Sequence, residues 1–260
     1  MILVLAACGS SATKGSNNGG LSGNGGSTTK GSNNGDSNSN GSPANNGSQG
    51  TCQPPSLAHC FTEATMQNYL NKIIPMVEAF YTATWARPLL PDHIYFIPVG
   101  QSMQSGCQDA SGNTTQDDSS YDYCPEDNNI YLGQAELWQL YNGAGDVAPA
   151  IGLAHEMGHE QQTNTGVPAP QSNAETLIHE DQADCLSGAW FAYEINQGSI
   201  QAEDYPSTAK YLEMIASAES DPNRTHGDLQ ERLNSFLDGK NSGPSGCNQF
   251  YPYNPIITSP

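Results

Sequence analysis

AHEMGHEQQ, residues 154–162, carries two histidines four positions apart, within a segment whose pattern predicts a helix over residues 147–163. Side chains at positions i and i+4 lie on the same helical face, so the His155 and His159 imidazoles can share one metal ion. Glu156 lies about 100° around the helix and can touch a water at that metal without ligating it. We therefore expect His155 and His159 to bind Zn²⁺ and Glu156 to act on the water.

A catalytic zinc keeps three protein ligands and one open position, so a third ligand is needed. The metzincin pattern would place Gly at position 162 and His at position 165, but this chain has Gln162 and Thr165. The next candidates lie in IHEDQADC, residues 178–185, which packs four potential metal or proton ligands and a thiol into a short stretch.

IHEDQADC falls inside a helix predicted from a capping box at Ser172 to about Asn196. Glu180 and Asp184 share one face of this helix, and an antiparallel crossing would turn that face toward the histidines. Glu180 is long enough to reach the metal, whereas Asp184 is placed to accept the ring N–H of a ligand histidine. We expect His179 to pack against the helix or support a ligand, and Asp181 to be solvated.

The remaining pattern predicts a mainly helical α+β domain with a small sheet. Further helices are expected at residues 61–85, 134–141, 205–217 and 228–238, strands at 93–97 and 129–132, and a polar loop over 101–123. Pro75 should kink or split the first helix, because it lacks a backbone N–H.

The first fifty residues differ in composition from the rest. Residues 1–8 end in Leu5-Ala6-Ala7-Cys8, which fits the lipobox of a bacterial lipoprotein lipidated at Cys8. Between positions 9 and 50, 31 of 42 residues are Gly, Ser or Asn. Such a stretch cannot bury enough apolar surface to offset its ordering entropy, so we interpret it as a disordered tether. Residues 51–260 are long enough for one domain with its own core.

The formal charge of the chain is −19. Lys14, Lys30 and Asp36 give the tether a charge of +1, so the rest of the chain carries −20. A surface this acidic repels phosphate backbones, and we therefore expect no nucleic-acid partner.

Cysteine usage suggests an exported protein. Six cysteines remain after Cys8, and an even number in an exported chain favours three disulfides. We favour Cys52–Cys60 and Cys107–Cys124, because each of these disulfides would close a short loop of polar sequence. Cys185 and Cys247 then remain as the third pair. The alternative for Cys185 is a buried free thiol on its helix.

AHEMGHEQQ followed by EDQADCLSGAW resembles the bacterial putative neutral zinc metallopeptidase family, whose members pair HExGH with a downstream E-x-Q-A-D-C-x-A-G-x-W. Upstream SGC (105–107), YCP (123–125) and IYL (130–132), and downstream Thr225-His226-Gly227 with Arg232 and Phe236, are similar to further blocks of that family. The resemblance covers roughly residues 85–250. It implies a zincin-type fold with His155, His159 and Glu180 as zinc ligands and Glu156 as the catalytic glutamate.

These patterns lead to two functional hypotheses. The first is a gluzincin-like zinc endopeptidase or a cell-wall amidase, held as a monomer on the outer face of a bacterial membrane by lipid at Cys8. As a peptidase it would hydrolyse protein or peptide substrates with Glu156 as general base. The downstream block makes His226 the candidate for stabilising the oxyanion, the alternative being a cap of the next helix. The second hypothesis is a zinc-binding but inactive lipoprotein that acts as a binding module. Retention of Glu156 favours the first.

Overall fold

The structure is a computed structural model. It describes residues 52, 54–85, 90–109, 111–218, 221, 223–253 and 255–256. The expected lipobox at 1–8 and the expected tether at 9–50 lie outside the described residues.

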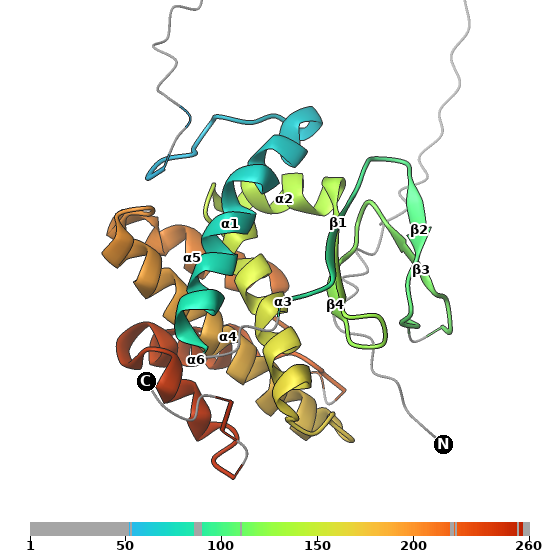
Figure 1. The fold of residues 1–260 in the computed structure, drawn as a ribbon, viewed down its shortest axis with the longest axis vertical. Helices are drawn as coiled ribbons and strands as arrows, with labels where there is room; N and C mark the ends of the chain where they lie inside the picture. The colour runs from blue at the N-terminus through green and yellow to red at the C-terminus, as the bar shows by residue number, and fades with distance from the viewer. Residues whose placement is uncertain are drawn as a thin grey trace, which may run out of the picture. The chain divides into compact units, whose positions relative to one another are not determined.

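The chain has an α+β fold that is mainly helical, as the sequence predicts. The α-helices are α1 (Met66–Thr84), α2 (Gln134–Ala144), α3 (Ala148–Thr165), α4 (Asn173–Gln197), α5 (Tyr205–Ile215) and α6 (Leu229–Ser242), with short 3-10 helices at Glu63–Thr65, Ala202–Asp204 and Pro244–Gln249. Figure 1 shows these helices grouped on one side of the domain and the strands on the other. None of the helices in the described part of the chain has the length and apolar character that a membrane span requires.

The strands form two small sheets. In the first, the order is β1 (His93–Ile97), β5 (Asn129–Gly133), β4 (Tyr121–Cys124), with β1 parallel and β4 antiparallel to β5. The second is the antiparallel pair β2 (Ser102–Gln104) and β3 (Thr115–Asp117). The central strand pairs His93 with Asn129 on one side and Cys124 with Asn129 on the other.

The prediction of a polar loop over residues 101–123 is therefore wrong, because β2, β3 and the start of β4 lie in it. β2 and β3 have only three residues each, too few to show an alternation that could be distinguished from loop sequence. All four residues of β4 are buried, because one face packs on the main core and the other on a small cluster that includes Cys107 and Tyr131.

α1 and α2 differ from their predicted form, and α6 ends at Ser242 rather than at the predicted residue 238. Pro75 lies inside α1 without splitting it, and it is exposed together with Asn71, so water can reach the Asn71 carbonyl that loses its partner. α2 continues through Gly143 to Ala144 and ends at Gly145, whose φ of 119° only glycine adopts without strain.

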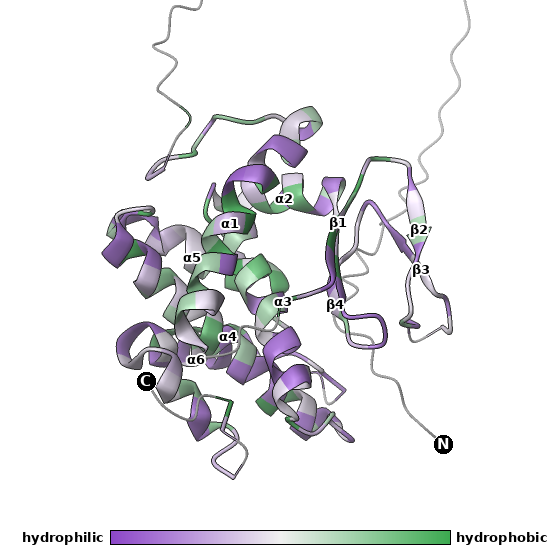
Figure 2. Cartoon of the chain, in the orientation of Figure 1, coloured by the Kyte–Doolittle hydropathy of each residue, from purple (hydrophilic) through white to green (hydrophobic). Residues whose placement is uncertain are grey.

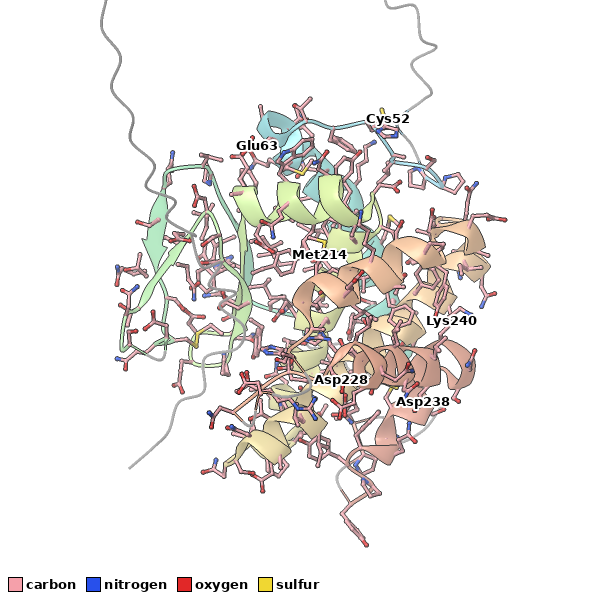
Figure 3. All side chains as sticks on the ribbon, turned by 180° about the vertical axis from the view of Figure 1, so that it is seen from behind. Cys52, Glu63, Met214, Asp228, Asp238 and Lys240 are labelled. Atoms are coloured by element: carbon pink, nitrogen blue, oxygen red, sulfur yellow. A yellow bond between two sulfur atoms is a disulfide. The ribbon has the colours of Figure 1, made fainter. Side chains whose placement is uncertain are left out.

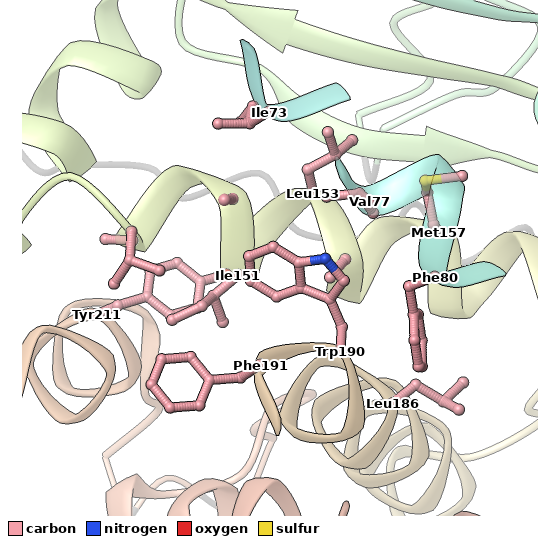
Figure 4. Close-up of a cluster of buried hydrophobic side chains, with 14 of the residues drawn as sticks. Ile73, Val77, Phe80, Ile151, Leu153, Met157, Leu186, Trp190, Phe191 and Tyr211 are labelled. Carbon is pink, nitrogen blue, oxygen red and sulfur yellow. The ribbon is translucent and has the colours of Figure 1, made fainter. Parts of the chain in front are cut away.

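α3 is the central helix of the domain. Every residue from Ala148 to Gln162 is buried, so α3 has no solvent-exposed face over this stretch. Figure 4 shows side chains of α1, α3 and α4 in one apolar cluster, with Val77, Leu153 and Trp190 among them. In Figure 2 the apolar colour is correspondingly concentrated where these helices face one another.

Small residues let the helices around α4 approach closely. A Cβ on Gly158 would lie 3.2 Å from the Ala183 Cα, which marks the crossing of α3 with α4. The crossing of α4 with α6 is tighter, because a Cβ on Gly188 would lie 2.0 Å from the Phe236 carbonyl oxygen. α6 begins at its N-cap Asp228 and carries Lys240 near its end, both labelled in Figure 3.

All three expected disulfides are present. Cys52 is bonded to Cys60, Cys107 to Cys124 and Cys185 to Cys247, so Cys185 is not a free thiol. The last bond ties the 3-10 helix at Pro244–Gln249 to α4. Three disulfides are typical of proteins outside the reducing cytoplasm.

Candidate metal centre

The two histidines of α3 and one carboxylate of α4 meet inside the domain. α3 ends at Gly166, which has the left-handed conformation typical of a helix stop, and α4 begins at the N-cap Ser172. His155 contacts Asp184, while His159 contacts Glu180 earlier in α4, so the helices cross antiparallel as predicted.

The three side chains bring their ligand atoms together. His155 Nε2 and His159 Nε2 lie 3.0 Å apart, and the Glu180 oxygens lie 3.2 Å from the first nitrogen and 3.3 Å from the second. All three residues are buried, with exposed fractions of 2%, 4% and 3%. Tetrahedral ligand atoms at zinc bond lengths of about 2.0–2.1 Å lie roughly 3.3–3.4 Å apart. The spacing therefore fits a zinc ion within a few tenths of an ångström.

The chemistry of the donor atoms also fits a cation. Burial alone would raise the pKa of Glu180, but His226 and His159 hold it well below its usual range, so the group is a carboxylate. Burial lowers the pKa of His155, but Asp184 and Glu180 outweigh it and raise that pKa to about 10. A position that holds a proton this strongly has the negative potential that a metal cation requires. His155, His159 and Glu180 could thus hold a metal ion.

Asp184 supports His155 from behind. Its Oδ1 lies 2.8 Å from His155 Nδ1 and also 2.8 Å from Arg232 Nη2. Burial raises the pKa of Asp184, but Arg232 and His155 more than offset it and keep the group ionised. A carboxylate only accepts hydrogen bonds, so His155 Nδ1 donates to Asp184, and Nε2 is the nitrogen that faces the site.

Glu156 faces the sheet side of the site. Its Oε2 accepts a hydrogen bond of 2.9 Å from the Tyr123 amide of β4, and the residue is 3% exposed. Burial raises the pKa of Glu156, and the nearby His155 and His159 partly offset that rise. A carboxylate whose pKa is raised toward neutrality is a better general base than a solvated one.

His226 reaches the site from the loop before α6. Its Nε2 lies 3.5 Å from Glu180 Oε2, and its Nδ1 lies 3.2 Å from the Thr225 hydroxyl oxygen. Asp228, not His226, caps α6, so the capping role considered for His226 is excluded. Burial lowers the pKa of His226 below its usual value, which favours a neutral imidazole.

His179 and Asp181, the other two candidate ligands in IHEDQADC, differ in how well their surroundings match the prediction. The His179 ring stacks on the His159 ring at 5.3 Å between centroids, and its Nδ1 lies 3.3 Å from the Tyr251 hydroxyl oxygen. It thus supports a ligand histidine, one of the two roles predicted. The expectation that Asp181 is solvated is wrong: burial raises its pKa to about 6, and its carboxyl is hydrogen-bonded to Ser235 of α6.

Two supporting residues were not predicted. Arg232 comes from α6 and contacts Asp184, which lies 48 residues earlier in the sequence. Local sequence patterns do not reveal so distant a contact, and only the family-like downstream block singled Arg232 out. Gln162 holds His159, with its Oε1 2.8 Å from Nδ1. Its spacing of three residues from His159 on the same helical face was a usable signal.

Comparisons with known proteins agree with this geometry. The sequence model of the family described as "Putative neutral zinc metallopeptidase" matches residues 37–250. "Uncharacterized protein YpfJ" of Escherichia coli strain K12 is 28% identical over 152 residues, which cover 49% of this chain and 53% of the relative. A protein of the same description from Escherichia coli O6:H1 matches equally well. The chain thus spans about half the length of the curated relatives it matches. No solved structure matches. Since the family model covers most of the sequence, the chain belongs to the putative neutral zinc metallopeptidase family.

Proposed function

We propose that the domain is a zinc-dependent peptidase, with His155, His159 and Glu180 as metal ligands and Glu156 as general base. The observation that carries the proposal is the buried Glu156 carboxylate beside the two histidines. A site that holds zinc only for structure has four protein ligands and no use for such a base. Membership of a zinc metallopeptidase family points the same way.

In amide hydrolysis, the metal site and Glu156 would have different roles. When bound, zinc supplies Lewis acidity that polarises a carbonyl group and acidifies water. Glu156 takes a proton from the attacking water and delivers it to the leaving amine. The Tyr123 amide fixes the Oε2 atom of Glu156, which leaves Oε1 to accept the proton. Each proton removed by Glu156 is returned in the same turnover, and the carboxylate is regenerated.

His226 is placed to stabilise negative charge on the substrate oxygen. Its Nε2 side faces Glu180 Oε2 at 3.5 Å, on the metal side of the loop. A neutral imidazole can donate one hydrogen bond to an oxyanion without requiring an acidic medium. Replacement of His226 by Ala should lower kcat and leave zinc affinity nearly unchanged.

We also propose that the enzyme works as a monomer on the outer face of a bacterial membrane, anchored by lipid at Cys8. The disulfides support an oxidising compartment. Metabolic labelling with a radioactive fatty acid should mark the full-length protein and not its Cys8→Ser variant. Equal labelling of both proteins would exclude Cys8 as the acceptor.

Zinc binding and cleavage of a generic unfolded protein together test the enzymatic proposal. The purified protein should contain one zinc, and Glu180→Ala should lose nearly all of it. Asp184→Ala should weaken zinc binding by about 10–100-fold, because it removes the acceptor behind a ligand. His179→Ala should change zinc affinity little. Equal zinc affinity of wild type and Glu180→Ala would exclude the ligand set, whereas zinc binding without any cleavage would favour a binding module.

A further inference from the structure

A chain of amide groups runs from the second ligand histidine to the carbonyl of a half-cystine. His159 Nδ1 lies 2.8 Å from Gln162 Oε1, and Gln162 Nε2 donates to Gln182 Oε1 at 3.0 Å. Gln182 Nε2 in turn donates to the Cys247 carbonyl oxygen at 3.1 Å. Gln162 Nε2 also donates to the His179 carbonyl oxygen at 2.8 Å. Both glutamines are 0% exposed.

The direction of every hydrogen bond in this chain follows from its fixed end. A backbone carbonyl only accepts, so the group that Gln182 turns toward Cys247 must be its NH₂. Its oxygen then faces Gln162, which must present its own NH₂ to that oxygen and to the His179 carbonyl. The Gln162 oxygen is left facing His159. No alternative orientation of either amide satisfies both backbone carbonyls.

The last step sets the tautomer of His159. An amide oxygen only accepts, so Nδ1 must carry a proton, and Nε2 is the nitrogen left to offer its lone pair to a metal ion. Nε2 is the atom that points at His155 Nε2 and Glu180. The two ligand histidines are therefore oriented by different means: His155 by the charged pair of Asp184 with Arg232, and His159 by neutral amides.

We propose that Gln162 and Gln182 are positioning residues that hold His159 ready to bind zinc, and that the Cys185–Cys247 disulfide anchors this amide relay. The disulfide places the Cys247 carbonyl against α4. The proposal rests on the metal site described above. It adds that zinc affinity depends on Gln182, whose amide is hydrogen-bonded to Gln162 and to the Cys247 carbonyl and would act on His159 through Gln162.

The test compares zinc affinity, measured by competition with a chromogenic chelator, in Gln162→Leu, Gln182→Leu and the control Gln161→Leu. Gln161 is the neighbouring glutamine of α3, is equally buried, and is hydrogen-bonded to Glu160. We expect about 10–100-fold weaker binding for Gln162→Leu and a smaller loss, about 3–10-fold, for Gln182→Leu. Gln161→Leu should stay within about twofold of wild type, although its stability falls as well.

A second readout is the exchange of the histidine ring protons with solvent. In the zinc-loaded wild type labelled with ¹⁵N-histidine, the His159 Nδ1–H proton should exchange slowly with solvent, as His155 Nδ1–H should. In Gln182→Leu the exchange at His159 should accelerate while that at His155 stays unchanged. If the relay had only a structural role, the exchange rates of His159 and of His155 in Gln182→Leu would each equal those of wild type. The Leu variants would then lose stability without a change in zinc affinity.

The zinc affinities distinguish a failure of the amide relay from a failure of the metal site. A wild-type protein that binds no zinc would exclude the metal site itself. A wild type that binds zinc, with Gln182→Leu matching Gln161→Leu in affinity and exchange, would overturn the relay alone.

Discussion

Replacing Arg232 by Met tests the buried ion pair behind the metal site. Arg232 Nη2 lies 2.8 Å from Asp184 Oδ1, and each side chain is 1% exposed. The substitution keeps an apolar stem but leaves the Asp184 carboxylate inside the domain with His155 as its remaining ring partner. Removing one member of a buried pair costs about 3–5 kcal/mol. Since His155 still donates, we expect the zinc-free protein to lose about 3 kcal/mol of unfolding free energy.

The loss should depend on pH. Burial raises the pKa of Asp184, but Arg232 and His155 reverse this and keep it below the ordinary value of 3.8. A carboxyl group with a depressed pKa stabilises the fold above its unfolded-state pKa, and that stabilisation is lost as the pH falls through the folded-state pKa. Without Arg232, burial dominates and the charged group destabilises the variant. The deficit should therefore be largest at neutral pH and shrink on acidification.

Urea unfolding with a chelator present, followed by circular dichroism across pH, measures this deficit. The matched control is Arg224→Met, because Arg224 is ion-paired with Glu231 at the surface, where solvent screens the charges and the loss should be much smaller. Asp184→Asn introduced into Arg232→Met should recover part of the stability. A deficit below about 1 kcal/mol at neutral pH, or one of equal size at every pH, would show that Arg232 does not stabilise a buried Asp184 carboxylate.

The close helix crossings and the buried carboxyl of β4 give two further predictions. Gly239→Ala should lower the free energy of unfolding by at least about 3 kcal/mol, because its Cβ would lie 1.7 Å from the Cys185 carbonyl oxygen. The control Gly143→Ala meets only the flexible end of Met214 at 3.2 Å and should be neutral or stabilising by up to about 1 kcal/mol. Equal effects of the two substitutions in thermal unfolding would contradict the close crossing of α4 and α6. Burial raises the pKa of Asp122 to about 8, so its contribution to stability declines as the pH rises from about 4 to 8. Asp122→Asn should therefore exceed wild type in stability at about pH 8 and match it at acidic pH in urea titrations, and a constant difference would count against this explanation.

Much of the helical part could be predicted from the sequence, because long helices repeat their pattern over several turns. The end of α3 at Gly166 and the start of α4 at Ser172 follow from standard capping residues. β1 is also predicted with its observed bounds, since His93–Ile97 is an apolar stretch bounded by prolines. The short strands β2 and β3 are not predictable in this way, because three residues carry too little pattern.

The meeting of His155, His159 and Glu180 could be predicted, because it depends only on helical spacing, on the length of the Glu180 side chain and on one antiparallel helix crossing. Arg232 and Gln182 could not be assigned roles, since their contacts depend on how α6 and the segment at Pro244–Gln249 dock on α4. The half-buried position of Asp181 was missed for the same reason: helical phase turns it away from Glu180, but not away from α6.

Hydrolysis of peptide bonds by this domain would need Glu156 as general base beside the zinc site. Glu156→Gln keeps the size of the side chain and removes its capacity to accept a proton. The decisive measurement compares cleavage of a generic unfolded protein by zinc-loaded Glu156→Gln and wild type, with zinc content measured in both samples. We predict one zinc per chain in both proteins and a rate lower by at least about 10²-fold in the variant. Equal cleavage by the two proteins would contradict the catalytic role of Glu156.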